Sequence, residues 1–145
     1  MDFFSSMDIS ASALTAERTR MNLISGNLAN ANTTRTADGG PYKRKDALFS
    51  TQRTSPSFGS TLSRIGAAAP SGVEVAQVVE DTSPPRLQYD PSHPDADAKG
   101  YVAMPNVNVM EEMADMIVAT RAYEANITAA QAAKSMALKT LELGR

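Results

Sequence analysis

The stretch PNVNVMEEMADMIVATRAYEANITAAQAAKSMALKTLELG, residues 105–144, decides the fold. It has no proline after its first residue and no glycine before its last, and apolar residues recur at helical spacing almost to its end. A helix over about residues 108–143 would be roughly 54 Å long, about three times the usual globular helix. Because a chain of 145 residues is too small to bury such a helix, we expect much of its apolar surface to face other proteins.

Two overlapping tracks of residues follow this predicted helix. The first has the alternating spacing of three and four that is typical of coiled coils, and the second approximates that spacing but departs from it after Thr120. The first track contains Met113, Met116, Thr120, Tyr123, Ile127, Ala130, Lys134, Ala137 and Leu141. The second contains Met110, Met113, Ile117, Thr120, Ala125, Ile127, Ala132, Leu138 and Leu141. Together they predict a wide apolar face that can contact more than one helix, although a core helix of an ordinary bundle is an alternative.

The start of this helix is also predicted by the sequence. Asn108 followed by Glu111 fits an N-terminal capping box, and the acidic residues of the first turns suit the positive end of the helix dipole. Glu112 is assigned to the polar side of the helix, so Glu112→Lys is expected to be mild.

A second amphipathic helix is predicted at the N-terminus. Met7, Leu14, Met21 and Leu28 recur every seven residues, and Ile24 lies on the same side. Gly26 weakens the interior by about 1 kcal/mol relative to alanine. The helix is expected to end among three asparagines, because asparagine tolerates the left-handed conformation found there; these are Asn27, Asn30 and Asn32.

The middle of the chain predicts a small β element within loops. Residues 45–52 suggest an extended piece, the valines of residues 73–79 are the best strand candidate, and residues 86–89 are expected to pair with that strand. The predicted fold is therefore mainly α: long terminal helices at 1–32 and 105–145 form a coiled-coil-like pair, one axial domain, around a loop-rich insert at 33–104.

Composition excludes several classes of function. The net charge is −2, and the basic residues between Arg35 and Arg53 lack the interleaved aromatics of a nucleic-acid site. Cysteine is absent, which excludes disulfides and thiolate metal sites. Asp2 and Asp8 occupy what would be the basic region of a signal peptide, so we expect either a cytoplasmic protein or export without a cleaved signal.

Residues 89–102, YDPSHPDADAKGYV, contain the only candidates for metal ligands. The candidate ligands are the side chains of Asp90, His93, Asp95 and Asp97. However, Lys99 and Asn106 stand where a calcium loop needs carboxylates. His93-Pro94-Asp95 also matches the tripeptide of J-domain co-chaperones, yet no basic helix precedes it. We interpret the segment as a proline-stiffened linker with Asx turns that leads into the last helix. No catalytic constellation is visible, so neither an enzyme nor a cofactor is predicted.

Several blocks together resemble the flagellar rod and hook axial proteins. They are DISASAL at 8–14, RMNLISGNLANANTT at 20–34, PYKRKD at 41–46, and residues 89–102 and 105–141. The block around residues 27–34 is shared across that family, whereas the last two blocks are narrower and resemble its proximal-rod members. The motif residues are Asn27, Asn30, Asn32, Tyr89, Pro91, His93, Pro94, Asp95, Asp97, Gly100, Asn106 and Asn108.

The resemblance implies a structural role in the flagellar basal body. It implies export without a cleaved signal through the flagellar type III apparatus and assembly in the periplasm into the rod. Expected partners are other copies of the chain, the rod proteins FlgB, FlgF and FlgG, and FliE. The expected assembly interface consists of Met7, Leu14, Met21, Ile24, Leu28, Met110, Met113, Ile117, Tyr123, Ile127, Leu138 and Leu141.

Two alternatives from other classes of protein are open at this point. One is a cytoplasmic helical adaptor or chaperone that binds partner helices. The other is a metal-dependent or J-like module centred on His93, the only histidine of the chain.

Overall fold

Two long helices dominate the computed structural model, which describes residues 3–37, 39–52 and 72–143. Helix α1 spans Phe3–Ala29 and helix α3 spans Val109–Leu143. The prediction of two terminal helices with a small β insert is confirmed. Residues 53–71, which belong to the predicted loop region, lie outside the described part.

Helix α3 begins where the capping residues predict it. The side-chain oxygen of Asn108 accepts a hydrogen bond from the backbone N–H of Met110 at 3.2 Å, and the carbonyl of Asn108 accepts one from Glu112 N–H at 3.0 Å. The side-chain bond satisfies an N–H group that a helix start leaves free, and the carbonyl bond is the first regular bond of the helix. With no proline or glycine inside it, the helix then continues unbroken for 35 residues.

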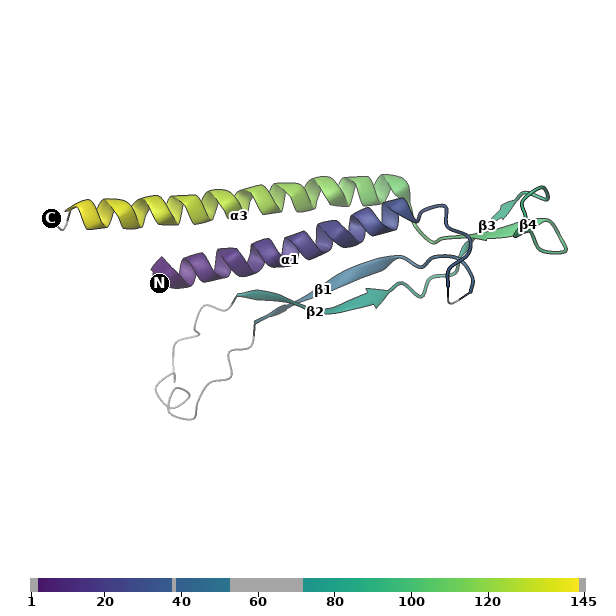
Figure 1. The fold of residues 1–145 in the computed structure, drawn as a ribbon, viewed down its shortest axis with the longest axis horizontal. Helices are drawn as coiled ribbons and strands as arrows, with labels where there is room; N and C mark the ends of the chain where they lie inside the picture. Colours follow the sequence, from purple (N-terminus) through teal and green to yellow (C-terminus); the bar gives the residue numbers. More distant parts are fainter. Residues whose placement is uncertain (1–2, 38, 53–71, 144–145) are drawn as a thin grey trace, which may run out of the picture.

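The molecule is elongated and layered (Figure 1). Helix α1 lies between α3 on one side and the hairpin of β1, Lys45–Thr51, and β2, Val73–Glu80, on the other. The two helices are antiparallel, and α3 continues beyond the N-terminal end of α1 (Figure 1). A second hairpin, of β3, Arg86–Tyr89, and β4, Tyr101–Met104, projects past the opposite end of the helix pair.

The strand pairing differs from the prediction. Strand β2 pairs antiparallel with β1, from Lys45 opposite Glu80 to Thr51 opposite Val73, with a bulge after Leu48. Strand β3 was expected to pair with β2, but it pairs with β4, with Arg86 opposite Met104 and Tyr89 opposite Tyr101. The consecutive prolines Pro84 and Pro85 stiffen the connection after β2, and prolines lack the N–H groups of a tight hairpin turn. The chain therefore continues away from β2 instead of folding back.

Residues 89–102 are consequently the tip of a hairpin and not a linker into the last helix. The return strand needs a residue in the left-handed region, and Gly100 supplies it with φ +80°. A side chain at Gly100 would also have its Cβ 3.0 Å from the ring of Tyr89, so the position suits glycine twice. The rings of Tyr89 and Tyr101 then pack edge to face, with centroids 5.3 Å apart.

The core of the subunit is small. The buried apolar side chains of the described residues are mostly short and are spread along the molecule: Ala16, Ile24, Ala31, Val102, Val107, Ala119 and Ala133. Large apolar side chains are instead exposed in many places, above all on α3. The chain thus buries little of its large apolar surface within itself, as its length predicts.

Candidate functional site

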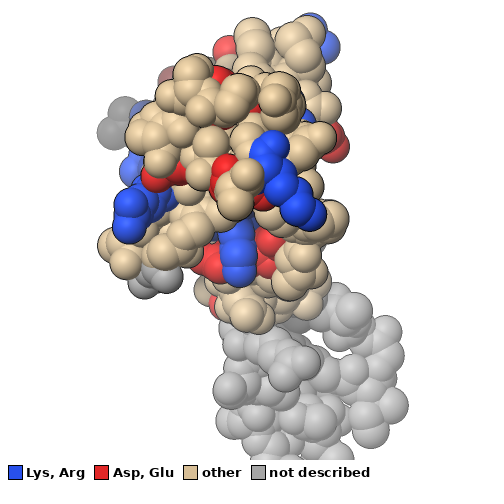
Figure 2. Space-filling view, turned by 90° about the vertical axis from the view of Figure 1, so that its right-hand side faces the viewer, with Lys and Arg blue, Asp and Glu red and all other residues tan. Residues whose placement is uncertain are grey.

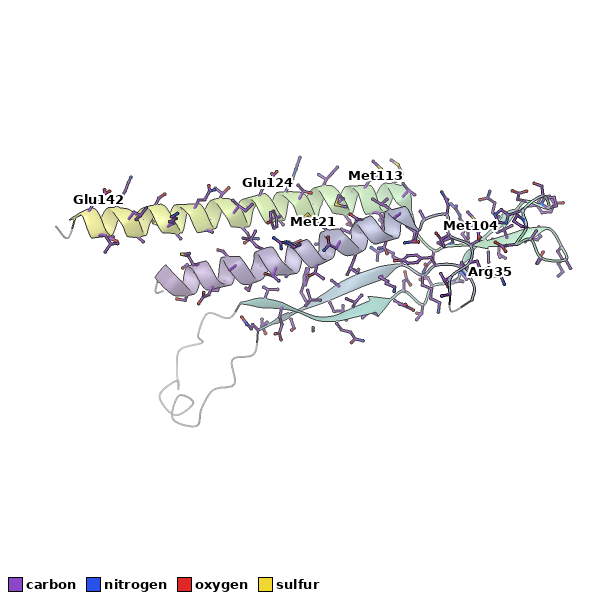
Figure 3. The ribbon with its side chains drawn as sticks, in the orientation of Figure 1. Met21, Arg35, Met104, Met113, Glu124 and Glu142 are labelled. Carbon is purple, nitrogen blue, oxygen red and sulfur yellow. The ribbon has the colours of Figure 1, made fainter. Side chains whose placement is uncertain are left out.

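The first candidate site is an exposed apolar face on the N-terminal half of α3. Met110, Met113 and Ile117 follow one another at spacings of three and four, and 75%, 51% and 57% of their surfaces are exposed. Figure 3 shows Met113 on the side of α3 that is turned away from α1. We call these three residues the outer face, because nothing in the described part of the chain covers them.

Helix α3 packs on α1 through a different set of residues. Most of its buried and half-buried positions alternate at spacings of four and three, which is the periodicity of a heptad seam. These seam positions are Glu112, Met116, Ala119, Tyr123, Asn126, Ala130, Ala133 and Ala137, and Asp115, Ala122 and Ile127 beside them are also half-buried. The first predicted track shares every second one of these positions. Of its other members, Ile127 is half-buried beside the seam, whereas the rest are exposed: Met113, Thr120, Lys134 and Leu141.

The predicted interface residues therefore have different surroundings. Ile24 is only 4% exposed and is used inside the chain. Leu138 and Leu141 are exposed near the end of α3, and Met7 is also exposed. The remaining members are half-buried: Leu14, Met21, Leu28, Tyr123 and Ile127. Met21 lies against α3, where the Thr120 hydroxyl is 3.9 Å from its sulfur.

The second candidate site is a polar cluster where α1, β1 and α3 meet. Asn27 and Glu112 are the buried polar side chains of the described residues, and both are 0% exposed. Asn27 Nδ2 donates to Glu112 Oε2 at 3.1 Å and to the carbonyl of Lys45 at 2.9 Å. Asn27 Oδ1 accepts from the Tyr42 hydroxyl at 3.1 Å and from Lys45 N–H at 2.9 Å. All four hydrogen-bonding positions of the amide are thus used.

Arg44 completes this cluster. Its Nε donates to Glu112 Oε1, and its terminal nitrogens lie 3.3 Å from Asp46 and 3.4 Å from Asp115. Its backbone N–H donates to the side chain of Asn106 at 2.9 Å, just before α3 begins. We call Asn27, Tyr42, Arg44, Asn106 and Glu112, with the backbone of Lys45, the polar junction.

The polar junction changes the titration of two of its members. Burial disfavours the charge of Arg44, but the hydrogen bond and charge of Glu112, helped by Asp46, raise its pKa above the ordinary value. Burial raises the pKa of the Tyr42 hydroxyl, although the nearby charge of Lys45 lowers it. Both residues therefore hold their protons, and Glu112 has a permanently charged partner.

Glu112 corrects the sequence interpretation. It was assigned to the polar side of the helix, yet it faces α1 at the start of the seam. Asn27 was expected at the end of the first helix, but α1 continues to Ala29 and the asparagine points into the junction. Asn30 does cap that end, because its Nδ2 donates to the carbonyl of Gly26 at 2.9 Å. Asn32 is exposed.

The motif residues of the hairpin tip form turns. Asp97 Oδ1 accepts from the backbone N–H groups of Lys99 and Tyr101, both at 2.8 Å. Hydrogen bonds from the hydroxyl and backbone of Ser92 lower the pKa of Asp90. Asp95 accepts from the Thr34 hydroxyl at 2.8 Å, while His93 Nδ1 accepts from Asp95 N–H at 3.1 Å. Within residues 3–37, 39–52 and 72–143, no group of three or more His, Cys, Asp or Glu is arranged to hold a metal ion.

On the end of the molecule that carries β3 and β4, the charge of the described residues gives no sign of a nucleic-acid site (Figure 2). Figure 2 views the end of the molecule that carries β3 and β4, and basic and acidic side chains are interspersed there. In the described part of the chain, no helix is both long and apolar enough to cross a membrane.

Comparison with known proteins identifies the family. Residues 7–35 match the model described as flagella basal body rod protein, and residues 98–143 match flagellar basal body rod FlgEFG protein C-terminal. The flagellar basal-body rod protein FlgC of Bacillus subtilis is 47% identical over the whole of both chains. FlgC of Borreliella burgdorferi is 46% identical, over 94% of this chain and 93% of its own, and FlgC of Escherichia coli is 44% identical over 95% of both.

The chain belongs to the FlgC family of flagellar basal-body rod proteins.

Membership of the FlgC family settles the class of function. The chain is a structural component of the flagellar basal-body rod, works together with other rod components, and is not an enzyme. The resemblance found in the sequence is confirmed, and the cytoplasmic adaptor or chaperone is not favoured.

The polar junction is what sequence reasoning missed in this FlgC family member. Arg44 was counted only among the basic residues between Arg35 and Arg53, and Tyr42 was given no role. One signal was available: Glu112 falls on the same heptad position as Ala119, Asn126 and Ala133, which follow it at intervals of seven residues. A charged residue at a seam position predicts a buried partner.

Proposed function

We propose that α1 and α3 form a coiled-coil-like axial domain from residues 1–32 and 105–145, which carries residues 33–104 as an insert. The antiparallel packing of the helices and the heptad spacing of the buried positions on α3 support this. Small residues on that seam, such as Ala119 and Ala133, allow the two helices to approach closely.

We further propose that the outer face of α3 contacts neighbouring subunits in the proximal rod. This rests on one observation: Met110, Met113 and Ile117 are exposed, large and contiguous on a helix whose other side packs on α1. Methionine adapts to irregular surroundings, which suits a surface that meets several kinds of subunit. Leu138 and Leu141, near the end of α3, extend the proposed contact surface.

The proposed neighbours are other FlgC copies, FlgB, FlgF, FlgG and FliE. The chain would reach them unfolded through the flagellar type III export apparatus, without a cleaved signal peptide, and assemble in the periplasmic part of the rod. The absence of cysteine supports this route, because no thiol can be oxidised on the way. The motif residues of the hairpin, from Tyr89 to Gly100, would shape the insert that projects from the axial domain.

Ile117→Asp tests the proposed interface. A charge buried in a subunit contact without a partner costs several kcal/mol, so we expect the protein to be made and exported but not to build a rod. The strain should be non-motile, without hook or filament, as seen by electron microscopy of isolated basal bodies.

Ser135→Asp is the matched control. Ser135 is exposed, and it lies on the same side of α3 because 18 residues make five full turns. The same charge at this already polar position should leave swimming close to normal. Normal swimming of the Ile117→Asp strain would show that the outer face is not an assembly surface.

A further inference from the structure

The Ala-rich seam between α1 and α3 does not by itself define which residues stand opposite each other. From residue 130 onward, its positions on α3 are all alanine, namely Ala130, Ala133 and Ala137. A shift of one helix along the other by seven residues keeps the heptad spacing. In the part of the seam after residue 130, it merely puts one small side chain of α3 in the place of another. Something outside this stretch must therefore select one register.

We propose that the polar junction fixes the register of α1 on α3, with Asn27 and Glu112 as the positioning residues. Both side chains are fully buried, and the 3.1 Å hydrogen bond between them joins the two helices directly. In a register shifted by seven residues along α3, Pro105 or Ala119 would stand where Glu112 now stands. Neither has a side chain that can accept a hydrogen bond from Asn27. Glu112 would then lose the amide that faces it, and a buried charge without its partners is strongly disfavoured.

The same junction fixes where the β hairpin sits on the helix pair. Asn27 holds both the N–H and the carbonyl of Lys45, the first residue of β1. Arg44, one residue earlier, reaches Glu112 and Asp115 on α3, while its carbonyl accepts from Asp81 N–H after β2. A change of register would break these bonds together, so helix register and hairpin position are selected as one unit.

Paired cysteines can measure the register, because the chain has no cysteine of its own. Met21→Cys with Thr120→Cys reports the observed register, since the Met21 sulfur and the Thr120 hydroxyl are 3.9 Å apart. Met21→Cys with Ile127→Cys reports a register shifted by seven residues. Both pairs are placed in the full-length chain, purified and in isolated basal bodies. They are oxidised, and intrachain cross-links are separated from interchain ones by gel mobility.

The test variant is Asn27→Leu with Glu112→Leu, which replaces the buried pair by apolar residues. We expect the ratio of shifted to observed cross-link to rise about fivefold or more, as for the loss of at least one buried hydrogen bond. The control is Asn126→Leu, because Asn126 lies on the same seam and, among the described residues, its side chain donates only to the carbonyl of Ala122 in its own helix. That variant should keep the parental ratio.

Three results would overturn the proposal. An unchanged ratio in the double variant would show that the Ala-rich seam selects the register without the junction. An equal loss of both cross-links, with the control intact, would show that the junction supplies stability alone. A parent chain that never cross-links Met21→Cys to Thr120→Cys would show that the helices do not pair in this register.

Discussion

Glu112 and Ile117 lie five residues apart on α3, and their surroundings are the reverse of what their chemistry suggests. The carboxylate of Glu112 is fully buried between α1 and Arg44, whereas the aliphatic side chain of Ile117 is 57% exposed. In a self-contained domain the apolar residue would be inside and the charged one outside. A subunit of the rod has a second set of surroundings, its neighbours, and the outer face is available to them.

The contrast separates two tasks on one helix. The polar junction binds α1, β1 and α3 to one another through directional hydrogen bonds, which have a single satisfied arrangement. The outer face offers non-directional apolar contact, which tolerates partners of differing shape. If the two sides of α3 differ in this way, substitutions in the polar junction should lower the stability of the subunit itself.

Glu112→Lys should be severe, contrary to the expectation from sequence. It would place a second positive charge beside Arg44 in a buried site, and removing one partner of a buried ion pair typically costs about 3–5 kcal/mol. Urea unfolding of the full-length chain, followed by circular dichroism, measures the free energy of unfolding. Glu111→Lys is the control, because Glu111 is exposed on the same turn. If both variants unfold at the same urea concentration, Glu112 does not stabilise the subunit.

The three asparagines give a graded version of the same test. Asn27→Ala removes the partner of Glu112 Oε2, of the Tyr42 hydroxyl and of the Lys45 backbone, and each buried group left unsatisfied costs about 1–3 kcal/mol. Asn30→Ala removes the helix-end bond to Gly26 and the bond from the Thr33 hydroxyl, together worth about 1–2 kcal/mol. Asn32→Ala changes an exposed side chain and should be within about 0.5 kcal/mol of the parent. The unfolding free energies should follow that order, and equal effects at all three positions would contradict a special role for the junction.

How far sequence predicts this molecule depends on the range of the interaction. The helices follow from local features, such as the Asn108 cap and the absence of proline and glycine from residues 106–143, and these predictions are confirmed. The partner of β3 was predicted wrongly: β2 was expected, but β3 pairs with β4. Strand pairing depends on contacts distant in sequence and, here, on the stiffness of Pro84 and Pro85.

The two candidate sites differ in the same way, by the range of the interactions that form them. The outer face follows from apolar periodicity, which a sequence displays directly. The polar junction joins residues 27, 44 and 112, whose proximity arises only when three separate elements meet. Periodicity placed Met113 on the seam in place of Glu112, since an apolar residue suited a core better than a charged one. Which neighbours meet the outer face stays a prediction.

Tyr42 gives a smaller test that depends on pH. The raised pKa means that the folded chain keeps the phenol proton at a pH where the unfolded chain, with a pKa of 10.0, has lost it. The folded state then binds more protons, so the free energy of unfolding falls as pH rises through and above 10. Below that pH the phenol is neutral in both states and contributes no slope.

Tyr42→Phe separates this effect from general alkaline unfolding. The variant should lose about 1 kcal/mol at neutral pH, for the hydrogen bond to Asn27, and its unfolding free energy should fall less steeply between about pH 9 and 11. Urea unfolding at several pH values measures both quantities. The exposed Tyr89→Phe is the control and should retain the parental slope. A parental slope in Tyr42→Phe as well would show that its phenol does not titrate with folding.

The smallest effect is expected at the hairpin tip, where the carboxylates already accept hydrogen bonds from groups of their own chain. Asp90 and Asp97 each hold two hydrogen-bond donors within the tip, and Asp95 holds the Thr34 hydroxyl. Because these oxygens already close turns, an ion would have to displace those bonds, and the tip offers no converging set of ligands such as calcium requires. We therefore expect calorimetric titration of the full-length chain with Ca²⁺ or Zn²⁺ to show no specific binding heat, for the parent and for Asp95→Ala alike. Micromolar binding that disappears in Asp95→Ala would show that the tip is an ion site and that its turns form around the metal.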